Sequence, residues 1–134
     1  MEKLINFNKS FENATNLHKQ GKINEALEIY LELQKEDNNN SQLLFQIGNA
    51  YLQKGSVELS IGFYRKVSEI DKNHFSNLNN LGGALATTGK YAEAIDVFKQ
   101  TLNKINKLRK KGILKKFRSI FEISMRCIKS IKCK

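Results

Sequence analysis

The chain has 134 residues, of which 40% are hydrophobic and 27% charged, a composition typical of one globular domain. No apolar run is long enough for a membrane-spanning helix, and the first residues lack the apolar block of a secretion signal, so we expect a cytoplasmic protein. The two cysteines, Cys127 and Cys133, exclude a disulfide framework across the body of the chain and are expected to be free thiols. The formal net charge is +10, but residues 99–134 hold 13 basic residues against one acidic residue, so any argument for polyanion binding concerns that segment alone.

A period of 34 residues organises the chain before this basic segment. Gly21, Gly55 and Gly89 lie at this spacing in similar contexts, HKQGKINEALEIY, LQKGSVELSIGFY and ATTGKYAEAIDVF. Apolar residues on both sides of each glycine recur at helical spacing. Each period therefore predicts two amphipathic helices joined by a tight turn at the glycine.

The three periods, residues 7–40, 41–74 and 75–106, differ in regularity. The first begins with a degenerate helix, in which Ser10, Asn13 and Ala14 occupy places that are apolar or glycine elsewhere. In the second and third periods we expect the glycines of the first helices to let the paired helices approach closely, against small residues of the second helices (Gly48 with Ser60, Gly82 with Ala94). Aromatic residues of the second helices are expected to fill the core: Tyr30, Tyr64 and Phe98.

These periods resemble the tetratricopeptide repeat family, whose pattern runs aromatic-x2-Leu-Gly-x2-Tyr, then Ala-x3-Phe, then Pro. The third period matches best, through Leu78, Leu81, Gly82, Leu85, Gly89, Ala94 and Phe98. The closing Pro is replaced by Asn38, Lys72 and Asn106, and we expect looser turns between repeats. The resemblance implies an all-α, right-handed solenoid of three helix pairs over residues 7–103, followed by a basic C-terminal helix or tail over 104–134.

The basic segment predicts an amphipathic helix from about Gly112 to Lys132. Its apolar face contains Ile113, Phe117, Ile120, Phe121, Ser124, Ile128 and Ile131. As a cap, this face would cover the last repeat at Tyr91, Ile95, Phe98 and Leu102. Two alternatives stay open: the basic face binds an anionic surface, or the segment is a truncated end of a longer array.

Nothing in the sequence predicts catalysis, a cofactor or a metal site. His18 and His74 have no Cys or carboxylate partners at ligand spacing, and each is expected to be a lone surface or groove histidine. The glycines stand at repeat turns or inside helices and form no phosphate-binding loop. We therefore expect a protein that is not an enzyme and has no small-molecule substrate.

The family resemblance also implies a concave groove lined by the first helix of each repeat. The corresponding positions are Phe11, Thr15, His18, Phe45, Asn49, Leu52, Asn79, Gly83 and Ala86. For Phe11 and Phe45, packing against a neighbouring helix is an equally good interpretation. Apolar anchors among amides suit an extended or helical protein segment.

One subclass of the family binds the acidic C-terminus of heat-shock chaperones through Lys, Asn and Arg. The matching positions here lack those cations and hold Phe11, Thr15, Gln46, Ser76 and Asn80, which argues against a chaperone-tail adaptor.

The predicted function is therefore a non-catalytic protein–protein interaction module that binds a peptide or helix segment in its concave groove. One alternative is a substrate-recruiting array separated from a transferase enzyme, because similar arrays precede such enzymes. The other is a protein that associates weakly with an anionic membrane or nucleic acid through the basic face of its tail, at Lys115, Lys116, Arg118 and Lys129.

Overall fold

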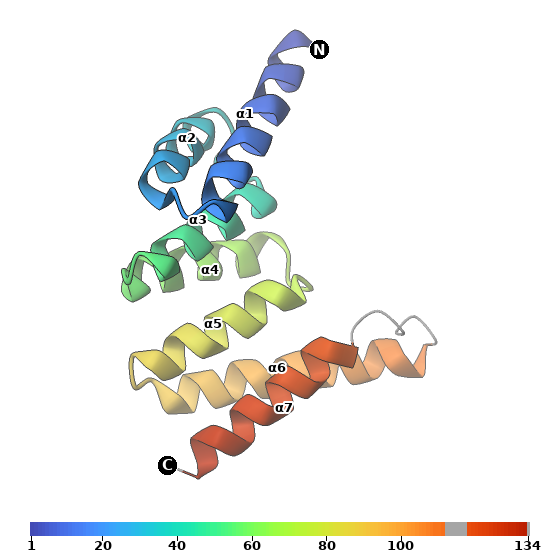
Figure 1. The fold of residues 1–134 in the computed structure, drawn as a ribbon. Coiled ribbons are helices and arrows are strands. Elements are labelled where there is room, and N and C mark those ends of the chain that lie inside the picture. The colour runs from blue at the N-terminus through green and yellow to red at the C-terminus, as the bar shows by residue number, and fades with distance from the viewer. Residues whose placement is uncertain (112–117, 134) are drawn as a thin grey trace. The chain divides into compact units, whose positions relative to one another are not determined.

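The computed structural model describes residues 1–111 and 118–133, with the side chains of the last helix described from Glu122 onward. Every regular element in these ranges is an α-helix (Figure 1). The chain divides into two compact units, Met1–Ile70 and Asp71–Lys134. The prediction of an all-α fold made of helix pairs is thus confirmed for the described residues.

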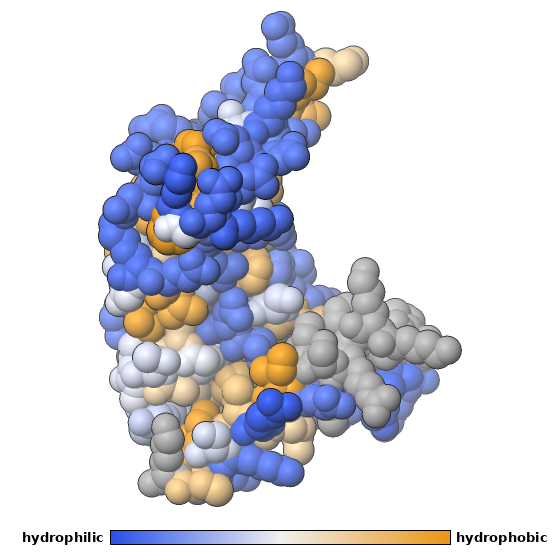
Figure 2. Space-filling model, viewed as in Figure 1, coloured by the Kyte–Doolittle hydropathy of each residue, from blue (hydrophilic) through white to orange (hydrophobic). Residues whose placement is uncertain are grey.

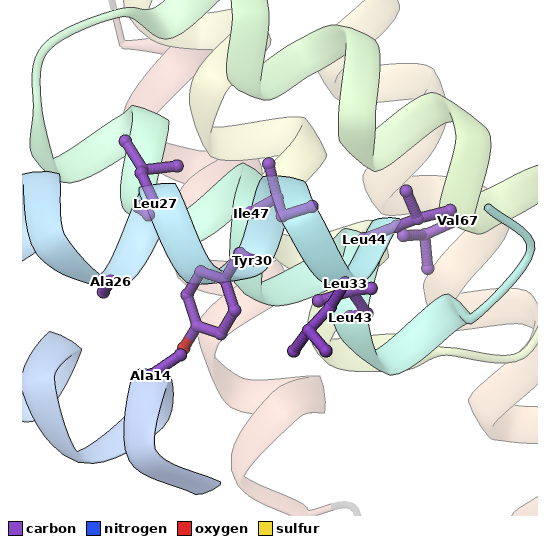
Figure 3. Packing of buried hydrophobic residues seen from close by; sticks show 10 residues of the cluster. Ala14, Ala26, Leu27, Tyr30, Leu33, Leu43, Leu44, Ile47 and Val67 are labelled. Atoms are coloured by element: carbon purple, nitrogen blue, oxygen red, sulfur yellow. The ribbon is translucent and has the colours of Figure 1, made fainter. Parts of the chain in front are cut away.

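The first unit consists of two helix pairs. The first pair is α1 (Glu2–Lys19) with α2 (Ile23–Glu36), and the second is α3 (Ser41–Gln53) with α4 (Val57–Ile70). Its core draws on all four helices and includes the fully buried Ala14, Tyr30, Ile47 and Val67. Figure 3 shows Tyr30 extending toward Ala14, while Leu33 and Leu43 of the neighbouring helices meet.

The second unit consists of one helix pair and a following helix. The pair is α5 (Phe75–Thr87) with α6 (Tyr91–Lys110), and α7 (Arg118–Lys132) packs against both. The boundary predicted between residues 103 and 104 falls inside α6. The helix continues because Ile105 is buried against Phe75 and Leu78, so its apolar face still has a partner beyond the repeat.

A glycine in the left-handed region closes each helix pair, as predicted from the period. The φ angles are +80° at Gly21, +85° at Gly55 and +78° at Gly89. At the second turn the N–H of Gly55 donates to the carbonyl of Leu52 at 3.0 Å. This conformation favours glycine because it has no Cβ, and the turn satisfies carbonyls at the end of the first helix.

Side-chain hydrogen bonds hold the turns between repeats in place of proline. The N–H of Asn39 donates to Asp37 Oδ1 at 3.2 Å, and the N–H of Asn73 donates to Asp71 Oδ1 at 3.0 Å. The next helix is then capped in both turns: Leu43 N–H donates to Asn40 Oδ1, and Asn77 N–H donates to His74 Nδ1. Asx bonds and N-caps therefore form these reversals without proline.

Gly48 and Gly82 mark close approaches, as predicted, and the atoms nearest to an added Cβ are aromatic. A Cβ on Gly48 would lie 2.7 Å from the ring of Tyr64, and a Cβ on Gly82 would lie 2.6 Å from the ring of Phe98. The predicted small partners, Ser60 and Ala94, are fully buried on the second helices, but the atoms nearest to an added Cβ belong to other residues. The aromatic ring of the second helix fills the space that the missing side chain leaves.

Candidate peptide-binding groove

Three predicted groove residues of α1 gather around one buried tyrosine of α2. The ring centroids of Phe11 and His18 lie 5.9 and 6.0 Å from that of Tyr30, which is fully buried. Thr15 Oγ1 donates to the Phe11 carbonyl at 2.8 Å and accepts from the Tyr30 hydroxyl at 3.5 Å. Phe11 and Thr15 stay half-buried, so each is anchored from below and still reaches solvent.

The second repeat reproduces this arrangement on α3. The ring centroids of Phe45 and Tyr64 lie 6.1 Å apart, and the Tyr64 hydroxyl donates to Asn49 Oδ1 at 2.8 Å. Phe45 and Asn49 are half-buried, whereas Tyr64 is fully buried. Leu52, one turn further along α3, is also half-buried. The same face thus carries an aromatic side chain, a polar side chain and a third residue on both α1 and α3.

Burial of these groups changes their acid–base behaviour. Burial lowers the pKa of His18, and a hydrogen bond with the Gln53 side chain opposes that shift. Only 8% of His18, predicted to be a surface or groove histidine, is exposed. Burial also raises the pKa of Tyr30, while Thr15 lowers it. Near neutral pH the face is therefore uncharged, with a neutral imidazole and a protonated phenol.

The predicted residues of α5 have a different environment. Asn79 Oδ1 accepts a hydrogen bond from Ser124 Oγ of α7 at 3.3 Å, and Ser124 is fully buried. A Cβ on Gly83 would meet nothing within 4 Å, and Ala86 is half-buried. Beneath them lies Phe98, which has no hydroxyl to bind a polar residue. This face is therefore small and weakly polar, and α7 reaches its edge.

Sequence reasoning treated Tyr30 and Tyr64 as core residues alone and missed their second role. Both are core residues, but their hydroxyls also bond the polar residue on the face above. The signal was present in the sequence: each tyrosine lies 15 residues after its partner, Thr15 or Asn49, and the third repeat pairs Phe98 with Gly83 at the same spacing. In each repeat, the tyrosine hydroxyl and the polar side chain that bonds it are therefore either both present or both absent.

The predicted basic face is described only in part. Lys115 and Lys116 lie outside the described residues, as do Ile113 and Phe117 of the predicted apolar face. Arg118 is the first residue of α7, and Lys129 is exposed. Within the described part of α7, Ser124 and Ile128 are buried. Of the residues that the cap was expected to cover, Phe98 and Leu102 are buried, Ile95 is half-buried and Tyr91 is exposed.

Residues 1–111 and 118–133 offer little other chemistry. Within these ranges, no group of three or more His, Cys, Asp or Glu side chains is placed to hold a metal ion. In the same part of the chain, no helix is long and apolar enough to cross a bilayer. Cys127 and Cys133 are free thiols.

Comparison with known protein families identifies two of the repeats. One model of the tetratricopeptide repeat matches residues 41–74, and a second matches residues 78–108. A comparison with curated proteins finds no match.

Several solved structures share the fold at low sequence identity. The Yersinia enterocolitica type III secretion chaperone SycD, in complex with a peptide of the translocator YopD, has a TM-score of 0.86 at 18% identity, over 99% of this chain and 95% of the other. PcrH from Pseudomonas aeruginosa, in complex with the chaperone-binding region of PopD, gives 0.84 at 13%, over 99% and 94%. The first TPR of Spaghetti (RPAP3), bound to an HSP90 peptide, gives 0.75 at 16%, over 95% and 90%.

Proposed function

Because the chain belongs to the tetratricopeptide repeat family, we propose that it is a non-catalytic, cytoplasmic module that binds a peptide or helical segment of another protein. The proposed contact residues are Phe11, Thr15 and His18 of α1 and Phe45, Asn49 and Leu52 of α3. The equivalent positions of the third repeat, Asn79, Gly83 and Ala86 of α5, are included in the proposal. The free thiols fit a reducing compartment.

The observation that carries this proposal is the repeated anchoring of half-buried residues on buried tyrosines. Phe11 and Phe45 each present part of an aromatic ring while the other part is held by Tyr30 or Tyr64. Thr15 and Asn49 are held by hydrogen bonds to the same tyrosines. Side chains fixed before binding lose little conformational entropy when a ligand arrives, which is what a recognition surface requires.

The chemistry of this face selects the kind of ligand. Its described residues are aromatic, aliphatic, amide and hydroxyl side chains with a neutral imidazole, and no cation stands at the positions that would capture a carboxylate terminus. A ligand with apolar side chains and exposed backbone groups fits it better than an acidic tail. The alternative ligands, an anionic membrane or nucleic acid, would bind the cations of α7. None of the contacts described above for this face involves those cations.

Binding to a peptide selected with the wild-type protein from a random library tests the proposal. We expect Phe45→Ala combined with Asn49→Ala to weaken binding at least tenfold, which corresponds to about 1.4 kcal/mol. Truncating an anchor at the centre of an interface commonly costs that much.

Phe63→Ala is the matched control, because Phe63 is also a half-buried phenylalanine stacked on a tyrosine, with its ring centroid 5.6 Å from that of Tyr51. It lies on α4, outside the proposed face, so binding is expected to stay unchanged at a similar cost in stability. Equal loss of binding in both variants would contradict the groove assignment. So would a loss of several kcal/mol of stability in the Phe45 variant alone, which would make Phe45 a core residue.

A further inference from the structure

A second concave surface lies between the first turns of α1 and the last turns of α2. It comprises a cavity of about 360 Å³ and an adjoining one of about 280 Å³, which share Ser10, Leu33 and Glu36. Phe7 lines the first cavity and Ile29 the second. We call this surface the α1–α2 groove. Its α1 residues lie on a face next to that of Phe11, Thr15 and His18, and Phe7, one turn before Phe11, borders both faces.

The α1–α2 groove has an apolar floor beside exposed apolar residues. Leu33 is buried and Phe7 and Ile29 are half-buried, and Leu4, which lines an adjoining hollow together with Phe7 and Glu36, is 62% exposed. Figure 2 shows apolar atoms at the N-terminal end of α1, among hydrophilic residues. Apolar side chains gathered at a concave surface favour a partner that covers them.

The rim of the α1–α2 groove is acidic. Glu28, Glu32 and Glu36 are exposed and follow one another at i, i+4 and i+8 along α2. Glu2 and Lys3 also line the cavity, and Glu32 pairs with Lys35 at 2.7 Å in an exposed contact that stabilises little. Three carboxylates thus stand over about 12 Å of helix, at 1.5 Å per residue.

The complementary surface is the outer face of α7. Met125 is 37% exposed, and Arg126, Lys129 and Lys132 are exposed on the same side of the helix, with Glu122 as one opposing charge. The buried Ser124 and Ile128 hold α7 on its own unit, and Ile128 lies at the edge of this face, one turn before Lys132. Three cations span about 9 Å beside an apolar side chain, a spacing close to that of the three carboxylates of α2.

We propose that the α1–α2 groove binds the outer face of α7 from a second copy of this chain. The groove offers apolar floor and carboxylates, and α7 offers an apolar side chain and cations at matching spacing. Charge complementarity at contact distance gives such a pair its specificity. Two chains with a net charge of +10 each repel one another at long range, so the contact depends on these local charges. The fraction of associated chains therefore rises with protein concentration.

Sedimentation of the full chain tests the proposal. At about 0.1 M ionic strength the screening length is about 10 Å, which suppresses long-range repulsion and leaves contact pairs, whereas at about 1 M it is about 3 Å. We expect the average mass to rise above 15.4 kDa with concentration in the first condition and to fall back toward it in the second.

Charge reversal identifies the two surfaces. Reversing the groove (Glu28→Lys, Glu32→Lys, Glu36→Lys) or α7 (Arg126→Glu, Lys129→Glu, Lys132→Glu) should leave each protein at the mass of one chain. Mixing the two variants, or combining both reversals in one chain, should restore association. The control Lys22→Glu, Lys54→Glu, Lys99→Glu changes the net charge as the α7 reversal does, on other exposed lysines, and should associate like the wild type.

All charge-reversed positions are exposed, so the melting temperatures of these variants should stay close to that of the wild type and identify any variant that misfolds. A wild-type chain that keeps the mass of one copy at every concentration would overturn the proposal. Failure of the double reversal to restore association would also overturn it. So would association that survives reversal of α7 but is lost in the variant Leu4→Ser with Phe7→Ser, because the groove would then bind the α1–α2 groove of the second copy instead of α7.

Discussion

The first two repeats and the third fix the same helix face by different means. On α1 and α3, a buried tyrosine of the paired helix holds the face from below, through Tyr30 with Thr15 and Tyr64 with Asn49. On α5, the residue below is Phe98 and the matching position is Gly83. There the hydrogen bond comes from Ser124 of α7 to Asn79.

The difference shows that a repeat pattern preserves volume more strictly than hydrogen bonding. Tyrosine and phenylalanine occupy the same buried site because their rings fill the same space. The hydroxyl adds a polar atom, and a buried polar atom needs a partner, so the residue above changes together with it. The third repeat loses that bond and depends on a helix that follows it in the chain.

Ile128→Ala should have the largest effect, because it weakens the contact of α7 with α5 and α6. Ile128 is 8% exposed, and deleting such a side chain commonly costs about 2–4 kcal/mol of unfolding free energy. Ile123→Ala on the same helix, where 40% of the side chain is exposed, should cost about 0.5 kcal/mol. Urea unfolding measures both. Equal costs would mean that α7 does not support the third repeat.

Gly82→Ala and Gly83→Ala test the close approach within the third repeat, at neighbouring positions of one helix. The Cβ that the first substitution adds would lie 2.6 Å from the buried Phe98 ring, and overpacking of this kind costs about 1–3 kcal/mol. At Gly83 the Cβ meets nothing within 4 Å, so the higher helix propensity of alanine should stabilise by up to about 1 kcal/mol. Thermal melts should therefore shift in opposite directions, and a shared direction would refute the packing described for α5 and α6.

A double-mutant cycle on Asn49 and Tyr64 tests the hydrogen bond that the third repeat lacks. Asn49→Ala and Tyr64→Phe should each cost about 1 kcal/mol, the net contribution of one such bond. The double variant should cost less than the sum, by a coupling of about 0.5–1.5 kcal/mol. Strictly additive costs in urea unfolding would show that the bond contributes nothing to the difference between the repeats.

The smallest expected effect concerns His18, whose counterparts are Leu52 and Ala86. Because burial lowers the pKa of His18 below its ordinary 6.5, the folded state favours the neutral imidazole. The resulting stability is present above about pH 6.5 and is lost as the pH falls through the lower, folded-state pKa.

Unfolding free energies between about pH 8 and pH 5 test this dependence. The measurement is best made in a His74→Asn background, which keeps an acceptor at that N-cap and leaves one histidine. His18→Gln should flatten the fall in stability on acidification, and an unchanged slope would contradict the assignment.

Sequence reasoning predicted the framework because its signals are backbone signals. The 34-residue period placed the turns at Gly21, Gly55 and Gly89, where positive φ excludes most other residues. The same reasoning misjudged contacts that depend on three dimensions. Gly48 was paired with Ser60 on the basis of size, and the nearest contact, the ring of Tyr64 one turn later on α4, was not foreseen.

The candidate groove was less predictable than the fold for a related reason. The face of each first helix follows from helical spacing, so its residues could be named. The spacing could not decide whether Phe45 belongs to the core or to a binding surface, because its ring is half-buried on Tyr64 and suits either role. The extension of α6 was equally hidden, since it depends on Ile105 reaching Phe75, a contact 30 residues apart in the chain.

The turns between repeats have a consequence for the time course of folding. They are formed by Asp37 and Asp71 with the caps Asn40 and His74, and the chain contains no proline. Isomerisation of bonds preceding proline takes tens of seconds and is slow enough to limit refolding. Here each reversal forms as fast as its side-chain hydrogen bonds, so refolding should be complete without a prolyl isomerase and without a slow phase from that source.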